Sequence, residues 1–213
     1  MRCWYSLVLT AAVLTCQAEV IDRIAVTVGK VVITESDLII DQRISTFLDQ
    51  KPVDLSGPQK RQAADRLVDQ TLILQEADVI RVPQPAKDEI TRMLRQVKAE
   101  FSSGDAYQAA LKSYQITEAE LVAHLTAGLR AMRFADLRFR PEIQLSPDEV
   151  RDSYDQMVAG WKQSGQASIP TFEASRADME KLLTDQRVSQ SLDRWLGSQR
   201  NQTEIIYREP AFK

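Results

Sequence analysis

Two β-branched runs near the start of the chain predict a β-hairpin. They are RIAVTV over residues 23–28 and VVIT over residues 31–34, and only Gly29 and Lys30 separate them. Glycine at the first of two central positions suits a type II′ turn. Strict alternation would place Ile24, Val26 and Val28 on one face of the first run, and Ala25 and Thr27 on the other. An isolated two-stranded ribbon is marginal in water, so the hairpin needs another strand or a helix packed against it.

Apolar residues at helical spacing then predict seven helices. Their approximate ranges are 34–48, 56–81, 86–101, 106–114, 117–139, 146–161 and 172–199. Capping boxes mark three of the starts: Thr34 with Asp37, Thr117 with Glu120 and Ser146 with Glu149. A last β-branched run over residues 203–208 predicts a strand. The expected fold class is therefore mainly α, with two strands at the start of the chain and one at its end.

The first eighteen residues have the layout of a secretory signal peptide. Arg2 precedes thirteen uncharged, mostly apolar residues, and CQA then supplies small residues before a cleavage site after Ala18. A bilayer span needs roughly 20 apolar residues, so this run is too short for a membrane anchor. Thr15 stands where a lipoprotein signal wants Gly, Ala or Ser before Cys16. We therefore expect residues 1–18 to be cleaved on export and residues 19–213 to form the mature protein.

Charge and cysteine content leave the expected fold unchanged and bear only on partners and disulfide bonds. The formal net charge of the chain is −3, and loss of Arg2 with the signal peptide makes it −4. A mildly acidic surface without a basic stripe argues against nucleic acid as a partner. Both cysteines, Cys3 and Cys16, lie in the signal peptide, so the mature chain needs no disulfide chemistry.

The sequence offers no recognisable catalytic or metal-binding motif. His124 is the single histidine, and a zinc or copper site built largely from carboxylates would be unusual. The ordinary interpretation of His124 is a histidine on the helix surface or at the edge of the core. No Walker loop, GxGxxG or GxSxG is present. We therefore expect no enzyme activity, no cofactor and no metal.

Three segments resemble the periplasmic chaperones of the SurA family. VIDRIAVTVGKVVITESDL over residues 20–38 resembles the opening hairpin and first helix of that family. LSPDEVRDSYDQM over residues 145–157 resembles the helix before its isomerase domain, and residues 171–207 resemble its closing helix and strand. Loose helical similarity covers the middle, so the resemblance spans nearly all of the mature chain.

The resemblance implies a multi-helix chaperone module in which the closing strand pairs with the opening hairpin in a small antiparallel sheet. Residues 19–145 would form its N-terminal part, and residues 146–213 its C-terminal helices and strand. In the family, parvulin-type prolyl isomerase domains separate the last two similar segments. Here only about sixteen residues, 155–170, lie between them, which is far short of a domain. The parvulin site also uses paired histidines, so the isomerase is expected to be absent.

The function implied by the resemblance is that of an ATP-independent periplasmic holdase. Its clients would be unfolded or nascent outer-membrane and secreted polypeptides, held in an apolar groove between helices, without stable insertion into the membrane. Met and aromatic side chains suit such a groove because they accommodate varied apolar sequences. The candidate peptide-binding residues are Met93, Phe101, Tyr107, Tyr114, Met132, Phe134, Phe139, Met157 and Trp161. Each of them taken alone is more often a core residue.

The alternative is a non-catalytic structural or assembly subunit. Its terminal strands would swap between two protomers, giving a helical homodimer that binds one dedicated partner. The two hypotheses differ in client range, because a holdase protects many unrelated chains.

Overall fold

The computed structural model describes residues 22–165 and 168–212, so the predicted signal peptide lies outside the described residues. The α-helices are α1 (Glu35–Leu48), α2 (Gly57–Val79), α3 (Lys87–Ala99), α4 (Gly104–Tyr114), α5 (Glu118–Phe139), α6 (Pro147–Gln163) and α7 (Phe172–Gln202). The strands are β1 (Ile24–Val28), β2 (Val31–Thr34) and β3 (Ile205–Tyr207), and the 3₁₀ helices are η1 (Arg140–Glu142) and η2 (Glu209–Phe212). The predicted mainly-α class with a small sheet is confirmed.

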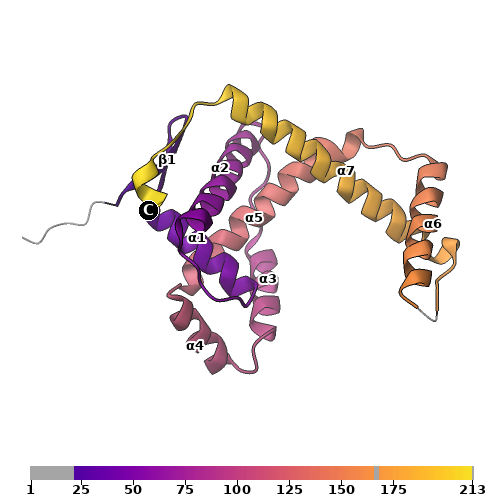
Figure 1. Ribbon diagram of the computed structural model, residues 1–213, viewed down its shortest axis with the longest axis horizontal. Coiled ribbons are helices and arrows are strands. Elements are labelled where there is room, and N and C mark those ends of the chain that lie inside the picture. Colours follow the sequence, from indigo (N-terminus) through magenta and orange to yellow (C-terminus); the bar gives the residue numbers. More distant parts are fainter. Residues whose placement is uncertain (1–21, 166–167, 213) are drawn as a thin grey trace, which may run out of the picture.

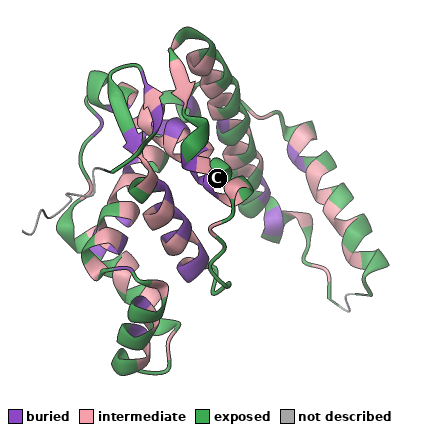
Figure 2. Cartoon of the chain, turned by 60° about the vertical axis from the view of Figure 1, so that its left-hand side comes forward, coloured by how far each residue is buried: buried purple, intermediate pink, exposed green. Residues whose placement is uncertain are grey.

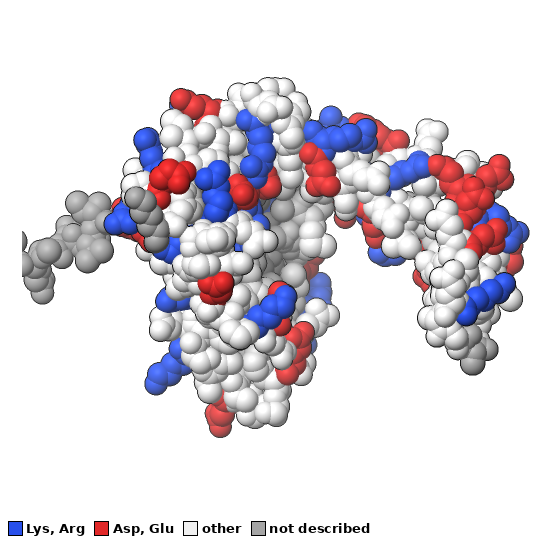
Figure 3. Space-filling view, viewed as in Figure 1, with Lys and Arg blue, Asp and Glu red and all other residues white. Residues whose placement is uncertain are grey.

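The molecule has a body and an arm (Figure 1). The body consists of the sheet, α1 to α5 and the C-terminal half of α7. The arm consists of α6 and residues 172–184 of α7, and it stands away from the body at the far end of α7 (Figures 1 and 3). Tyr154 of α6 meets Phe172 of α7 edge to face, with ring centroids 5.4 Å apart. The long helix α7 therefore connects the two parts.

The sheet joins the two ends of the described chain, as the resemblance predicted. Its strand order is β2-β1-β3, and β1 pairs antiparallel with both neighbours. Val26 lies opposite Ile33 of β2 and Tyr207 of β3, so these three side chains share one face. The closing strand thus adds the third strand that the hairpin requires.

A β-bulge overturns part of the predicted alternation. The register between β1 and β2 shifts between Ile24 and Val26. Ile24 is consequently 45% exposed and Ala25 is fully buried, the reverse of the strict alternation. A bulge inserts one extra residue and turns the following side chains over, which alternation alone cannot reveal. The turn itself agrees with the prediction, because Gly29 has a φ of +57° and Lys30 does not share its positive φ.

The helix starts follow their capping residues. The Thr34 hydroxyl accepts the Asp37 N–H at 3.3 Å, and the Asp37 carboxylate accepts the Thr34 N–H at 2.8 Å. The predicted capping boxes that open α5 and α6 are also present. However, α4 begins earlier than predicted because the Ser103 hydroxyl accepts the N–H of Ala106 and so caps Gly104 as the first helical residue. These satisfied donors fix where each helix enters the body.

The buried apolar side chains of the body form three clusters. Figure 2 marks in purple the buried positions along the chain. The first packs the sheet against α1, α2 and the C-terminal segment, and includes Val26, Val28, Ile33, Leu38, Val68, Leu72 and Ala211. The second joins α1, α4 and α5 through Ile44, Phe47, Tyr107, Leu111, Leu121 and Leu125. The third joins α2, α5 and α7 through Ile73, Ala77, Phe134, Phe139 and Val188. The core of the body thus consists of three clusters distributed along it and is not a single compact cluster.

The C-terminal segment is held at its side chains as well as at its backbone. The Tyr207 hydroxyl donates to the Asp65 carboxylate at 2.5 Å, and the Arg61 guanidinium stacks over the Tyr207 ring at 3.6 Å. Burial raises the pKa of Tyr207, with the Asp65 carboxylate acting in the same direction. The Ala211 side chain is fully buried. These contacts dock the last residues of the described chain on α2.

Gly57 permits a close approach at this docking site. A Cβ atom at position 57 would lie 2.2 Å from the carbonyl oxygen of Phe212. Real Cβ atoms do not come this close to backbone oxygen, so a side chain at this position would displace η2.

We predict that Gly57→Ala destabilises the protein by about 1–3 kcal/mol, because the added methyl group overpacks the η2 contact. Gly104→Ala is the matched control, since Gly104 also begins a helix and a Cβ there meets nothing within 4 Å. Urea unfolding of both variants measures the difference. Equal stability of the two variants would contradict the close approach.

Deletion of residues 203–213 removes β3 and η2 and leaves the hairpin without its third strand. We expect a loss of about 4 kcal/mol, the scale set by exposing two or three apolar side chains. In a chain of this length that loss lowers the melting temperature by about 10 °C. Thermal unfolding followed by circular dichroism tests this, and an unchanged melting temperature would show that the helices stand without the sheet.

Candidate functional site

Three of the nine predicted peptide-binding residues belong to the core. Tyr107, Phe134 and Phe139 are buried, and Phe134 is completely inaccessible. The Phe134 ring meets Phe139 edge to face, with centroids 5.9 Å apart, and it also packs on Trp195 of α7 at 5.0 Å. For these three residues the prediction of a groove lining is wrong, because the helix faces that carry them close against other helices.

Three more of the nine cluster at the α3–α4 end of the body. Met93, Phe101 and Tyr114 are half-buried and pack against the cluster around Phe47. Phe101 stacks on Phe47 with centroids 5.4 Å apart, and Tyr114 meets Phe47 edge to face at 5.5 Å. The Tyr114 hydroxyl donates to the Lys51 carbonyl at 2.9 Å. These side chains therefore brace α3 and α4 on α1.

Met157 and Trp161 lie on the arm, half-buried, on the face of α6 that also carries Val150 and Tyr154. This face packs on α7, because Val150 is buried and Tyr154 contacts Phe172. The nine residues are thus distributed over the α3–α4 end, the core beneath α5 and the arm, which Figure 1 places at different ends of the molecule. They do not converge on one groove.

Met132 is the member of the set that is clearly exposed, at 63%. It lines a hollow of about 510 Å³ between α5 and α7. The apolar part of this lining comes from Ala131, Met132, Ala135, Val188 and Leu192. We call it the α5/α7 hollow. The α7 residues belong to a helical stripe visible in the sequence, but no sequence pattern indicates that α7 crosses α5 at this point.

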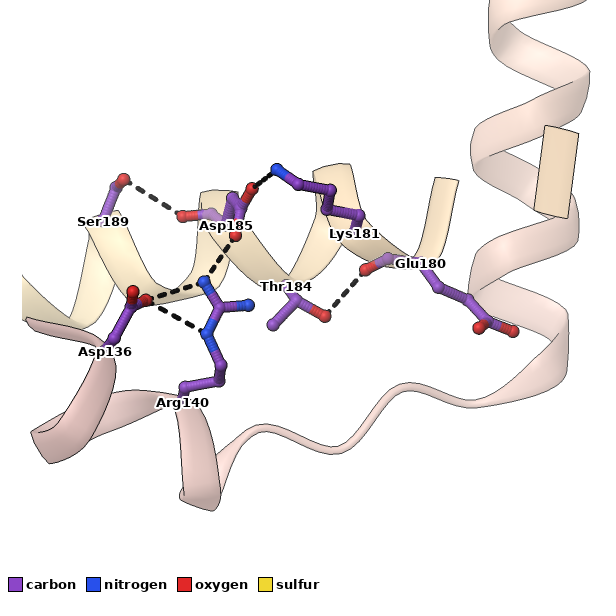
Figure 4. Close-up of polar contacts among 7 residues, drawn as sticks. All are labelled: Asp136, Arg140, Glu180, Lys181, Thr184, Asp185 and Ser189. Atoms are coloured by element: carbon purple, nitrogen blue, oxygen red, sulfur yellow. Dashed lines mark hydrogen bonds and ion pairs between the residues drawn. The ribbon is translucent and has the colours of Figure 1, made fainter. Parts of the chain in front are cut away.

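An ion-pair network forms part of the lining of the α5/α7 hollow, and Figure 4 shows its contacts. Arg140 Nη2 lies 2.7 Å from Asp136 Oδ1 and 2.7 Å from Asp185 Oδ1. Lys181 Nζ lies 2.6 Å from the other Asp185 oxygen, and the hydrogen bonds from Lys181 and Arg140 lower the pKa of Asp185. Two cations and two anions balance, and partly exposed pairs contribute little stability each. The network therefore orients α7 on α5 without giving the hollow a net charge.

A second hollow, of about 400 Å³, lies between α1, α2 and α5. Its apolar lining comes from Ile33, Ile40, Ile44, Leu67, Ala123 and Ala127, and its polar lining from Asp37, Asp41, Gln70, Glu120 and His124. We call it the α1/α2/α5 groove. No pattern in the sequence indicates this groove, because its lining comes from β2 and three separate helices.

A buried carboxylate lies in the wall of the α1/α2/α5 groove. Asp41 is 6% exposed and accepts bonds from Arg66 Nε at 3.0 Å and Nη2 at 2.6 Å. Its other oxygen lies 3.8 Å from His124 Nδ1, and the His124 side chain is 27% exposed. Burial lowers the pKa of His124 more than the Asp41 charge raises it, and the Arg66 charge lowers it further. His124 is therefore neutral at pH 7, and its half-buried side chain agrees with the expected histidine on the helix surface or at the edge of the core.

Over residues 22–165 and 168–212, no group of three or more His, Cys, Asp or Glu side chains is placed to hold a metal ion. In the same ranges no helix combines the length and apolar character that a membrane span requires. On the face shown in Figure 3, basic and acidic side chains are interspersed.

Comparison of the chain with protein-family models and with curated proteins finds no match to either.

We predict that His124 makes the protein less stable as the pH falls below about 6.5. The unfolded chain takes up a proton near the ordinary histidine pKa, whereas the folded chain resists it until its own lower pKa is reached. The unfolded state then binds more protons, so the free energy of unfolding decreases across this window. In His124→Gln the decrease should be shallower between pH 7.5 and 5.5.

Urea unfolding at pH 7.5, 6.5 and 5.5 measures this dependence. The chain contains a single histidine, so the difference between the two proteins isolates its contribution. Parallel pH profiles would contradict the assigned direction.

Proposed function

We propose that this protein is an ATP-independent periplasmic holdase that binds unfolded outer-membrane or secreted polypeptides. The observation that carries the proposal is Met132, which is 63% exposed beside the apolar floor of the α5/α7 hollow. The flexible thioether of an exposed methionine can pack against varied apolar side chains, which suits a site that takes many client sequences. The resemblance of residues 20–38, 145–157 and 171–207 to the SurA family supports the same function.

The α5/α7 hollow has a size and lining that suit weak, general binding. About 510 Å³ holds a few side chains of an extended chain rather than a folded domain. Ala131 and Ala135 leave room above the α5 backbone, and Val188 with Leu192 supplies apolar contact from α7. Binding of the unfolded state keeps a client soluble in proportion to the concentration of free chaperone. Release then needs no nucleotide, because shallow contacts dissociate quickly.

Exposed leucines on α5 and α7, the two helices that form this hollow, add apolar surface. Leu182 of α7 is exposed where the arm leaves the body, and Leu137 is exposed on α5. A client segment seated in the hollow can extend along either helix. Scattered weak contacts of this kind hold a chain without imposing a fold on it.

The proposal predicts that the protein suppresses the aggregation of an unfolded β-barrel precursor diluted from urea. Met132→Gln should raise the concentration needed for half suppression about five-fold, since it removes roughly 1 kcal/mol of apolar contact. Val79→Gln is the control, because Val79 is 73% exposed at the end of α2 and does not line the α5/α7 hollow. Light scattering at several chaperone concentrations gives the comparison.

The outcomes separate the hypotheses. Suppression that Met132→Gln weakens and Val79→Gln leaves unchanged supports both the function and the site. Equal suppression by the two variants would indicate that clients bind outside the α5/α7 hollow. No suppression for several unrelated clients, together with tight binding to a single partner, would favour the assembly subunit instead. In the structure β3 pairs with β1 of the same chain, so the sheet needs no strand exchange.

A further inference from the structure

The α1/α2/α5 groove differs from the α5/α7 hollow in its charge. All the charged side chains among its lining residues are acidic: Asp37 and Asp41 on successive turns of α1, and Glu120 on α5. One of these carboxylates, that of Asp41, is paired with a cation, the Arg66 guanidinium. His124 adds no positive charge at pH 7 because burial lowers its pKa. The groove therefore has a net negative lining.

Two of these carboxylates are fixed in place and lack a cation. Asp37 Oδ2 accepts both the N–H and the hydroxyl of Thr34, and Glu120 Oε2 accepts the same two groups of Thr117. Across the described ranges neither carboxylate forms an ion pair within 4.0 Å. The capping boxes thus hold two charges rigidly and leave the second oxygen of each carboxylate available for a ligand.

Apart from Gln70 and His124, the remaining lining of the groove is aliphatic. Ile33 comes from β2, Ile40 and Ile44 from α1, and Leu67 from α2, while Ala123 and Ala127 leave open space over α5. An apolar floor beneath rigid carboxylates matches a side chain with a long aliphatic stem and a cationic head. Lysine and arginine have this combination.

We propose that the α1/α2/α5 groove binds a lysine or arginine side chain of a client polypeptide where that residue adjoins apolar residues. The proposal builds on the function proposed above and names the kind of segment that this second site selects. The stem packs on Ile40 and Leu67, and the charged head meets the carboxylates of Asp37 and Glu120. The α5/α7 hollow, whose charges balance, takes uncharged apolar side chains.

The test uses fluorescein-labelled peptides of equal length that alternate leucine with lysine or leucine with glutamine, at 50 mM salt and pH 7.5. We expect the wild-type protein to bind the lysine peptide about five-fold more tightly than the glutamine peptide, as fluorescence anisotropy measures. A few-fold preference is the scale of one or two partly exposed charge pairs.

Two pairs of variants separate the groove from the general negative charge of the protein. Glu120→Gln keeps its capping box because glutamine also serves there, and it should reduce the lysine preference two- to five-fold. Glu149→Gln makes the same change in the capping box of α6 and should leave the preference intact. Ala123→Arg fills the groove and should abolish the preference, while Ala109→Arg, at an exposed site on α4, should not.

Several results would overturn the proposal. One is equal binding of the two peptides by the wild type, which would assign the groove to uncharged apolar segments. Equal losses of the lysine preference in Glu120→Gln and Glu149→Gln would show that the preference arises from the net charge of the protein and not from the groove. A dimer that Ala123→Arg dissociates, with no lysine preference, would assign the groove to a second copy of this chain.

The aggregation assay distinguishes failure of this proposal from failure of the proposed function. With a lysine- and arginine-free client, Ala123→Arg should still suppress aggregation, because that client uses the α5/α7 hollow. If the wild type suppresses no aggregation but shows the lysine preference and loses it in Ala123→Arg, the groove assignment stands and the holdase function fails. If suppression persists without any lysine preference, the function stands and the groove assignment fails.

Discussion

The pairing of β1 with β3 is the constraint on which the rest of the structure depends. A two-stranded hairpin cannot bury its apolar face alone, and β3 is the strand that completes the sheet. Residues almost two hundred positions apart therefore come together, as the bond from Arg23 Nη1 to the Pro210 carbonyl at 2.9 Å illustrates. Closing a loop of this length costs only slightly more entropy than closing a much shorter one, because the cost of loop closure grows slowly with length. The helices α1 and α2 and the C-terminal segment then pack against this sheet.

Anchoring the C-terminus determines the path of α7. Arg200 near its end lies 2.6 Å from Asp69 and also donates to the Asp65 carbonyl at 3.0 Å, and hydrogen bonding to Asp69 raises the pKa of Arg200. Farther back, Trp195 packs on Phe134. A helix of 31 residues held along its C-terminal half extends beyond the body, and its other half carries α6 as the arm. The α5/α7 hollow lies where this helix leaves the body, so its position follows from the anchoring of the chain end.

The two hollows have different chemistry although both are built on α5. At the α5/α7 hollow, Arg140 links Asp136 to Asp185 and the charges cancel (Figure 4). In the α1/α2/α5 groove, the carboxylates of Asp37 and Glu120 serve first as helix caps and remain without cations within the described residues. A residue can therefore satisfy a local structural need and still contribute its charge to a surface. The proposed specificity of the groove arises from this double use.

The sequence alone determined the local structure: capping boxes located the starts of α1, α5 and α6, prolines and glycines located the breaks, and β-branched runs located the strands. These are decided by interactions within a few residues, which a sequence displays directly. The bulge at Ile24, the early start of α4 and the burial of Phe134 were not predictable in this way. A methionine and a phenylalanine two positions apart on α5, Met132 and Phe134, have similar apolar character, yet one is 63% exposed and the other is fully buried. Only the tertiary structure decided between them, because exposure depends on which helix crosses α5, and α7 covers the side that carries Phe134.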